Sequence, residues 1–287
     1  IALSDAKAKS RPTPKEIGLL WDASHSAVQR DRVKEFAFLD AYFKELKDTK
    51  VVLSTFNIRS AKPLTFEVKN GNWQALKSHL ESLQYDGATD GNAIDFNLKT
   101  DEILLFSDGI FNFGSKEFSV NEIVKQAKIP VSVVNASAVT NTPKMQYLAN
   151  ATGGSFIDLT TLTTEQALNV ARTVPFQLLD IEVKSGKVAE IFPQKGVTIS
   201  KGNFTLAGEL QSEEATLVLS FGYPKKVMVQ KEVKFVANPD ASESEFNLLR
   251  RIWVEKQIAQ LQREGVEQKQ IDAVGREYGI VTEGNSL

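Results

Sequence analysis

The first 175 residues alternate short, almost continuously apolar runs with longer segments of helical periodicity. The apolar runs are typical of strands buried on both faces, and they cover residues 17–21, 51–56 and 103–106. The helical segments cover residues 28–46, 120–127, 143–151 and 163–174. Strands that alternate with helices in this way form a mostly parallel sheet with helices on both faces. The sequence therefore predicts a doubly wound α/β domain.

Residue-level signals refine this α/β pattern. Residues 64–68 alternate between apolar and polar side chains, which predicts an edge strand. Pro130 interrupts the apolar run 129–134, so we expect this strand to begin at an edge or a bend. Asn72 is expected to cap a helix that carries Trp73.

The pattern changes after residue 176. Alternating apolar residues, punctuated by glycines that include Gly186, Gly196 and Gly202, predict an antiparallel β-sandwich. From Ser242 the spacing becomes helical, with Ser242 or Ser244 as the cap. This helix has an apolar stripe of Phe246, Leu249, Trp253, Val254, Ile258 and Leu261. We therefore divide the chain into a linker or arm (1–14), an α/β domain (15–175), a β-sandwich domain (176–240) and a helical tail (241–287).

Composition excludes several classes of function. The 287 residues carry a net charge of -2, so nothing indicates a nucleic-acid partner. Cysteine is absent, which removes disulfides, thiolate catalysis and zinc–thiolate sites. No apolar run approaches the 18 or so residues of a transmembrane helix. The first residue is Ile and no signal peptide is present, so we expect the chain to be a piece of a longer protein.

Three polar stretches follow predicted strands or lie in the loops between them. They are Asp22-Ala23-Ser24-His25-Ser26, residues 86–91 with Thr89 at their centre, and Asp108 after residues 103–106. In parallel sheets, ligands bind beyond the carboxyl ends of the strands, where Asp22 and Asp108 are predicted to lie. Two carboxylates and three hydroxyls suit Mg²⁺ or Mn²⁺, and Ca²⁺ is not excluded. The candidate metal ligands are therefore Asp22, Ser24, Ser26, Thr89 and Asp108.

This pattern resembles the metal-ion-dependent adhesion site (MIDAS) of the von Willebrand factor A (VWA) family over residues 15 to about 175. The resemblance implies a Rossmann-like VWA fold with a divalent ion at those five positions. In the family the serines and one acid usually bind directly, and the threonine, or the last aspartate through water, changes role with the conformational state. The resemblance also implies a partner that offers an Asp or Glu carboxylate, without catalysis. His25 and Ala88 stand where glycine is common, and neither change removes a ligand.

The later part of the chain resembles the inter-alpha-trypsin-inhibitor heavy chains and their bacterial relatives, which pair a "VIT" domain with a VWA domain. The similar segments are residues 190–193, 202–208, 249–261 and 277–282. The resemblance implies a VIT domain before residue 1 and an extracytoplasmic location, whether periplasmic, secreted or on the cell surface.

Two other functions stay open at this level. The α/β domain could be a structural module of a larger exported protein, with a vestigial metal site. It could also be an enzyme that uses Mg²⁺, although no G-x-S-x-G elbow, Walker A loop or G-x-G-x-x-G follows a strand. Asp86 and Asp90 flank Thr89, and they either tune the site or only shape the loop.

Overall fold

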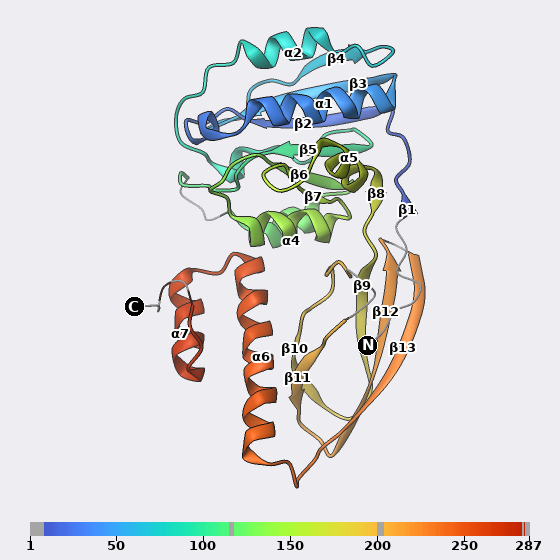
Figure 1. The fold of residues 1–287 in the computed structure, drawn as a ribbon, viewed down its shortest axis with the longest axis vertical. Helices are drawn as coiled ribbons and strands as arrows, with labels where there is room; N and C mark the ends of the chain where they lie inside the picture. The colour runs from blue at the N-terminus through green and yellow to red at the C-terminus, as the bar shows by residue number, and fades with distance from the viewer. Residues whose placement is uncertain (1–8, 115–117, 200–203, 225, 283, 285–287) are drawn as a thin grey trace. The chain divides into compact units, whose positions relative to one another are not determined.

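The structure is a computed structural model that describes residues 9–114, 118–199, 204–224, 226–282 and 284. Its described part forms two compact units, Lys9–Val174 and Pro175 onward. Figure 1 shows the α/β arrangement of the first unit and the β-strands and helices of the second. The predicted fold class, a mostly parallel sheet followed by antiparallel strands and helices, is confirmed.

The first unit contains a six-stranded sheet that is parallel except for one edge strand. Its spatial order is β4 (Leu64–Val68), β3 (Thr49–Phe56), β2 (Glu16–Asp22), β5 (Glu102–Phe106), β6 (Val131–Asn135) and β7 (Phe156–Asp158). Only β4 runs antiparallel to its neighbour, and it lies at an edge as its alternating pattern predicts. The central strands β2 and β5 are buried along almost their whole length, which explains their continuous apolar runs.

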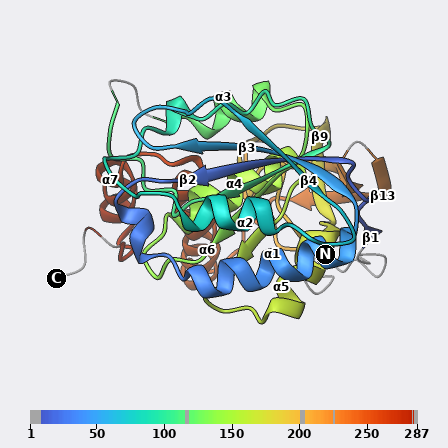
Figure 2. The same ribbon diagram turned by 90° about the horizontal axis from the view of Figure 1, so that it is seen from above.

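Helices cover both faces of this sheet. One face packs against α1 (Arg32–Leu46), α2 (Gln74–Glu81) and α5 (Thr164–Arg172). The other face packs against α3 (Val120–Gln126) and α4 (Thr142–Thr152). Seen from above, α3 lies on the opposite side of the strands from α1 (Figure 2). Both cores are built from side chains that alternate along the same strands, as a doubly wound sheet requires.

Local hydrogen bonds move two helix starts away from their predicted positions. The segment expected to be helical from residue 28 contains a separate 3-10 turn, η1 (Ser26–Gln29). Helix α1 starts only at Arg32, because the Asp31 side chain caps it by accepting from the Lys34 N–H at 3.1 Å. Asn72 accepts from the N–H of Gln74 at 3.0 Å, while Trp73 occupies the cap position itself.

Pro130 lies directly before β6 instead of inside it. The strand begins at Val131, and it is an interior strand between β5 and β7. Proline has no N–H to donate to the ladder, so the pairing starts one residue later. The carbonyl of Pro130 still accepts from Ile103 N–H at 2.9 Å.

The segments that enter and leave the first unit lie side by side. The two-residue strand β1 (Lys9–Ser10) pairs antiparallel with β8 (Thr173–Val174). Arg11 follows β1 and is 7% exposed. Its guanidinium donates to the carbonyls of Gly153, Thr173 and Ala171 at 3.0, 3.2 and 3.3 Å. Burial lowers the pKa of Arg11, and the charge of Glu102 opposes that shift.

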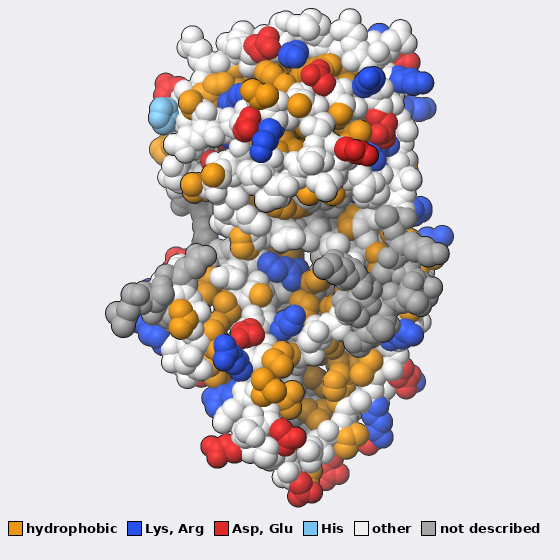
Figure 3. Space-filling model, in the orientation of Figure 1, with side chains coloured by type: hydrophobic (Ala, Val, Ile, Leu, Met, Phe, Trp, Pro, Cys, Tyr) orange, Lys and Arg blue, Asp and Glu red, His pale blue; other side chains and the backbone are white. Residues whose placement is uncertain are grey.

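The second unit contains two antiparallel sheets around one core. One has the order β13 (Lys226–Val236), β12 (Glu214–Tyr223), β9 (Gln177–Ser185), and the other pairs β10 (Val188–Phe192) with β11 (Ala207–Leu210). Residues from both sheets meet in a cluster centred on Leu178, Leu217, Leu219 and Phe221. On the face drawn in Figure 3, hydrophobic side chains gather over β10 and β11. Gly202, one of the predicted turn glycines, lies outside the described residues.

The chain ends in two helices, α6 (Glu243–Glu264) and α7 (Gln268–Tyr278). Ser242 caps α6 in a capping box with Glu245, which decides between the two predicted caps. The apolar stripe expected along α6 is only partly covered. Val254 and Ile258 are buried, whereas Phe246 and Leu249 in the first turns are 58% and 64% exposed. Among the described residues, no helix has the length and apolar content needed to cross a membrane.

Replacement of Arg11 tests how strongly the entry and exit segments are tied. Arg11→Ala removes charge-assisted hydrogen bonds to buried carbonyls, and we expect unfolding free energy to fall by about 2 to 3 kcal/mol. Denaturant unfolding of the full chain measures the change. Arg59→Ala removes an exposed arginine and serves as the control, with an expected change within about 0.5 kcal/mol. Equal effects of the two substitutions would contradict a structural role for Arg11.

Candidate metal centre

The parallel pairing of β2 with β5 brings two of the predicted ligands to one edge. The register aligns Trp21 with Phe106, so both strands end at the same level. Asp22 is the last residue of β2, and Asp108 lies two residues beyond the end of β5. Both are buried, with exposures of 0% and 2%. The structure thus places two carboxylates side by side at the carboxyl end of the sheet, as the sequence predicts for that edge.

Hydrogen bonds from the protein fix both oxygens of Asp22. Its Oδ1 accepts from the Ser24 N–H at 3.0 Å, and its Oδ2 accepts from the Ser107 hydroxyl at 2.9 Å. Ser107 itself accepts from the N–H of Gly109 at 3.1 Å. Sequence reasoning gave Ser107 no role, although its place directly before Asp108 was a usable signal. Ser107 joins the two acid-bearing loops.

The first motif contacts the second acid through Ser26. The hydroxyls of Ser24 and Ser26 lie 3.2 Å apart, and the Ser26 side chain hydrogen bonds to Asp108. Asp108 Oδ1 also accepts from the N–H of Ile110 at 2.9 Å. Burial raises the pKa of Asp108; the charge of Asp22 adds to the rise, and the bonds from Ile110 and Ser26 oppose it. Four of the five predicted ligands therefore form one connected group.

Thr89, the fifth predicted ligand, is placed by the backbone of its loop. That loop meets the first motif through His25 N–H to Gly87 O at 2.9 Å. It meets the loop after Asp108 where Thr89 N–H donates to the Asn112 side chain and Thr89 O accepts from Phe113 N–H, both at 3.1 Å. Thr89 is buried and lies in a loop bonded to both acid-bearing loops.

Gly109 has to be glycine for the loop after Asp108 to turn as it does. Its φ of 71° lies in the left-handed region that side chains disfavour. A Cβ at this position would come within 2.5 Å of Met145 Cγ on α4. The Asp-Gly pair therefore lets the chain turn sharply while the Asp108 side chain stays at the edge of the sheet.

Arg30 ties together the two strand ends that carry the acids. Its guanidinium donates to the carbonyl of Phe106 at 2.6 Å and to the carbonyl of Asp22 at 3.0 Å. It also lies over the Trp21 ring at 5.0 Å and is 3% exposed. Nothing in the sequence singles out this arginine, because its role depends on the spatial pairing of β2 and β5.

A buried carboxylate holds Arg30 in place. Glu35 on α1 lies 3.0 Å from Arg30 Nε and 3.5 Å from Arg32 Nε, and its side chain is fully buried. Burial raises the pKa of Glu35, and the charges of Arg30 and Arg32 oppose that rise. Arg32 also packs over the Tyr85 ring at 3.8 Å, just before the loop with Thr89. The Arg30–Glu35 ion pair therefore supports the ends of β2 and β5.

The donor set determines which ion these residues fit. No group of three or more His, Cys, Asp or Glu in the described part of the chain could hold a metal ion. A metal at this edge therefore needs hydroxyl ligands, and Ser24, Ser26 and Thr89 supply them beside two carboxylates. Such all-oxygen sets fit hard cations such as Mg²⁺. The residues present are thus compatible with the predicted ion.

The acids that flank Thr89 make local bonds within their own loop. Asp86 accepts from the N–H of Gly87 at 2.7 Å, and Asp90 caps the short 3-10 turn η2 (Gly91–Ala93) by accepting from Asn92 N–H at 2.9 Å. These contacts match the loop-shaping role, one of the two roles that the sequence left open.

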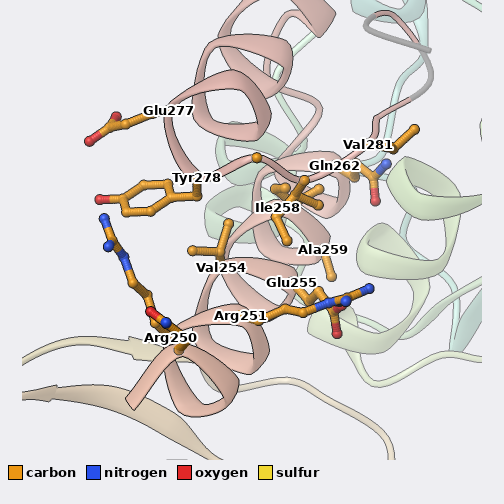
Figure 4. A pocket seen from close by; sticks show the side chains of 13 residues that line it. Arg250, Arg251, Val254, Glu255, Ile258, Ala259, Gln262, Glu277, Tyr278 and Val281 are labelled. Atoms are coloured by element: carbon orange, nitrogen blue, oxygen red, sulfur yellow. Dashed lines mark hydrogen bonds and ion pairs between the residues drawn. The ribbon is translucent and has the colours of Figure 1, made fainter. Parts of the chain in front are cut away.

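A pocket lies between α6 and α7. It has a volume of about 620 Å³, and its floor includes Val254 and Ile258 (Figure 4). Its charged side chains already have partners: Arg250 lies over the Tyr278 ring at 4.8 Å, and Arg251 Nε lies 3.0 Å from Glu255 Oε1. Among its described lining residues, this pocket offers no group of converging polar atoms comparable to those at the strand ends.

Comparison with solved structures gives similar folds at low identity. VWA2, an ArnB paralog from Sulfolobus acidocaldarius, has 14% identity and a TM-score of 0.49 over 95% of this chain and 80% of its own. A von Willebrand factor type A structure from Catenulispora acidiphila has 10% identity and a TM-score of 0.48, over 93% and 80%. Proximal thread matrix protein 1 of the mussel byssus, in a structure with a zinc-occupied MIDAS motif, has 14% identity and a TM-score of 0.41, over 55% and 46%.

The first two of these structures are VWA proteins, and the TM-scores of all three are below 0.5. No protein-family model matches its sequence, and no curated protein matches it. We base no conclusion about function on structural similarities of this level. The function proposed below therefore depends on the residues at the strand ends.

Neutralising Asp108 should have opposite effects with and without metal. Because burial and the nearby Asp22 charge raise the pKa of Asp108, its ionised form destabilises the metal-free fold at pH 7. We expect Asp108→Asn to raise the melting temperature in EDTA and to abolish the further rise that Mg²⁺ gives the wild type. Calorimetry under both conditions measures this, and a lower melting temperature in EDTA would contradict it.

Variants of the buried ion pair separate stability from metal affinity. Glu35→Gln leaves Arg30 buried without its partner and should lower stability by about 3 to 5 kcal/mol. The double variant Arg30→Met, Glu35→Leu should recover most of that loss, because both members of the fully buried pair are gone. Arg32, the other cation beside Glu35, is partly exposed and still donates to the Ala27 carbonyl at 2.8 Å. Its Mg²⁺ affinity should stay about tenfold below wild type, since the two strand ends lose their shared donor. Calorimetric titration checks this, and full recovery of affinity would show that Arg30 only fills the core.

Proposed function

We propose that this chain is a divalent-metal-dependent protein-binding module that captures an acidic residue of its partner. The single observation that carries the proposal is the convergence of Asp22, Ser24, Ser26 and Asp108 at the carboxyl edge of the sheet. Thr89 lies in a loop that is bonded to the loops on both sides of it. The ion is Mg²⁺ or Mn²⁺, with Ca²⁺ as a further candidate.

The contacts suggest different roles for the ligands. Asp22 accepts from the Ser24 N–H and the Ser107 hydroxyl, and in this proposal it orients the first motif and reaches the ion through water. Ser24, Ser26 and Asp108 would bind it directly. With only two carboxylates nearby, a divalent ion keeps strong attraction for one more carboxylate, which a partner's Asp or Glu supplies in an open position.

The chemistry favours binding over catalysis. An enzyme would need a further acid or base beside the ion, and the flanking acids Asp86 and Asp90 instead bond to their own loop. The upstream VIT domain, the relationship to inter-alpha-trypsin-inhibitor heavy chains and the extracytoplasmic location stay predictions. Sequencing of the complete reading frame tests the first of these directly.

Metal-dependent stability of the full chain tests the proposal. At about 100 times its dissociation constant, Mg²⁺ should stabilise the fold by roughly 2.7 kcal/mol. That corresponds to a rise of about 5 to 11 °C in the melting temperature of a domain of about 150 to 250 residues. We expect the rise in wild type and its loss in Asp22→Ala, measured in Mg²⁺ and in EDTA.

Asp86→Asn is the matched control, because it removes an exposed carboxylate from the neighbouring loop without removing a proposed ligand. Its Mg²⁺-dependent rise should equal that of the wild type. No rise in any of the three proteins at several millimolar Mg²⁺ would favour the alternative function, a structural module with a vestigial metal site.

A further inference from the structure

Exposed hydrophobic residues of the first unit concentrate at the metal edge. Six large hydrophobic side chains are exposed among the described residues of Lys9–Val174. Four of them lie on loops after the carboxyl ends of β2, β3, β5 and β6, and these are Val28, Ile58, Phe113 and Val139. The other two are Val33 in the first turn of α1 and Leu64 at the start of β4. We call the first four the apolar rim.

Backbone bonds fix two rim residues close to the acid-bearing loops. Val28, 57% exposed, lies in η1 two residues after Ser26, and its N–H donates to His25 O at 3.1 Å. Val139, 63% exposed, directly precedes Thr140, whose hydroxyl donates to the Asp108 carbonyl at 2.8 Å. Each is therefore held at the margin of the proposed ion.

The other two rim residues are fixed to the loop with Thr89. The N–H of Phe113 donates to the Thr89 carbonyl at 3.1 Å, and its side chain is 55% exposed. Ile58 follows Asn57, which bonds to both flanks of Thr89: its carbonyl accepts from Asp90 N–H at 2.9 Å and its side chain donates to Asp86 O at 3.1 Å. All four loops of the rim are thus bonded within the site.

The charges at this edge disfavour a partner with many acidic residues. Asp86 is exposed and Asp90 is partly exposed in the loop with Thr89, and both would repel neighbouring acids of a partner. On the described parts of the loops that carry the rim, the exposed basic groups are Arg59, Lys62 and His25, while Arg30 is buried against Glu35. The metal compensates one carboxylate at the ion, whereas additional acids of a partner would meet acidic and basic side chains together and gain no one-sided attraction.

We propose that the apolar rim selects a partner segment in which a single Asp or Glu is flanked by hydrophobic side chains. This inference rests on the proposed function, because the metal ion has to position the acid before the rim can contact its neighbours. Isolated exposed hydrophobic residues need no explanation, but a group of four around one polar site indicates an interaction surface. The ion attracts the acidic side chain, and the apolar rim determines which acidic segments bind most tightly.

Two short peptides serve as the probe. Both are acetylated and amidated and carry one central Asp, with the sequences Gly-Leu-Asp-Val-Gly and Gly-Ser-Asp-Thr-Gly. Dissociation constants are measured by NMR titration of the isotope-labelled full chain in Mg²⁺. We expect the apolar peptide to bind at least tenfold more tightly, a difference of about 1.4 kcal/mol. Replacement of its Asp by Asn, or addition of EDTA, should abolish binding.

Variants of the rim assign that preference to its residues. Phe113→Ser with Val139→Ser should reduce the tenfold preference to less than threefold while leaving Mg²⁺-dependent stabilisation unchanged. Phe246→Ser with Val236→Ser is the matched control, since these residues of the second unit are 58% and 65% exposed. The control should keep the full preference.

The outcomes distinguish the two proposals. Equal affinity for both Asp peptides, still dependent on Mg²⁺ and on the Asp, overturns the rim inference and leaves the proposed function standing. A preference that survives in the rim variant, or is lost in the control, also overturns it. Binding that ignores Mg²⁺ or the Asp-to-Asn change, or no binding of either peptide, overturns the proposed function and the rim inference together.

Discussion

The parallel pairing of β2 with β5 is the constraint on which the site depends. Because Trp21 is aligned with Phe106, both strands end at the same level, and the residues that follow them meet at one edge. A shift of this register would separate Asp22 from Ser107 and Asp108. In the present register the Ser107 hydroxyl donates to Asp22, and the charge of Asp22 helps to raise the pKa of Asp108. The hydrophobic cores on both faces of the sheet fix that register, so packing far from the edge positions the polar residues there.

A buried charge pair reinforces this arrangement. Arg30 connects the last carbonyls of the two strands, and Glu35 on α1 holds Arg30 in turn. Taking such a pair out of water costs free energy, and pairs like it are weak evidence of stability by themselves. Its geometric effect is more informative, because one rigid guanidinium sets the spacing between two loops that would otherwise move separately. The site thus combines two strand ends that Arg30 joins with neighbouring loops that expose hydrophobic side chains.

Sequence patterns predicted the fold class and the strands well, because buried parallel strands leave continuous apolar runs. They also predicted that Asp22 and Asp108 lie at strand ends. The spatial partners Arg30 and Asn112 left no such signal. Arg30 donates to the Phe106 carbonyl, 76 positions away, and Asn112 accepts from Thr89 in a loop contact that no periodicity encodes. The start of α1 was misplaced because a local bond, the Asp31 cap, interrupts the helical pattern. The exposed turns of α6 show that an apolar stripe predicts a contact surface without showing whether this chain covers it.

The most direct test of the account is a crystal structure of the full chain soaked in Mn²⁺, with the ion located by its anomalous scattering. The account predicts one strong peak between the hydroxyls of Ser24 and Ser26 and the carboxylate of Asp108, at about 2.1 to 2.2 Å from its direct ligands. A peak elsewhere in the chain, or no peak at millimolar Mn²⁺ in crystals whose strand-end loops are well ordered, would contradict it.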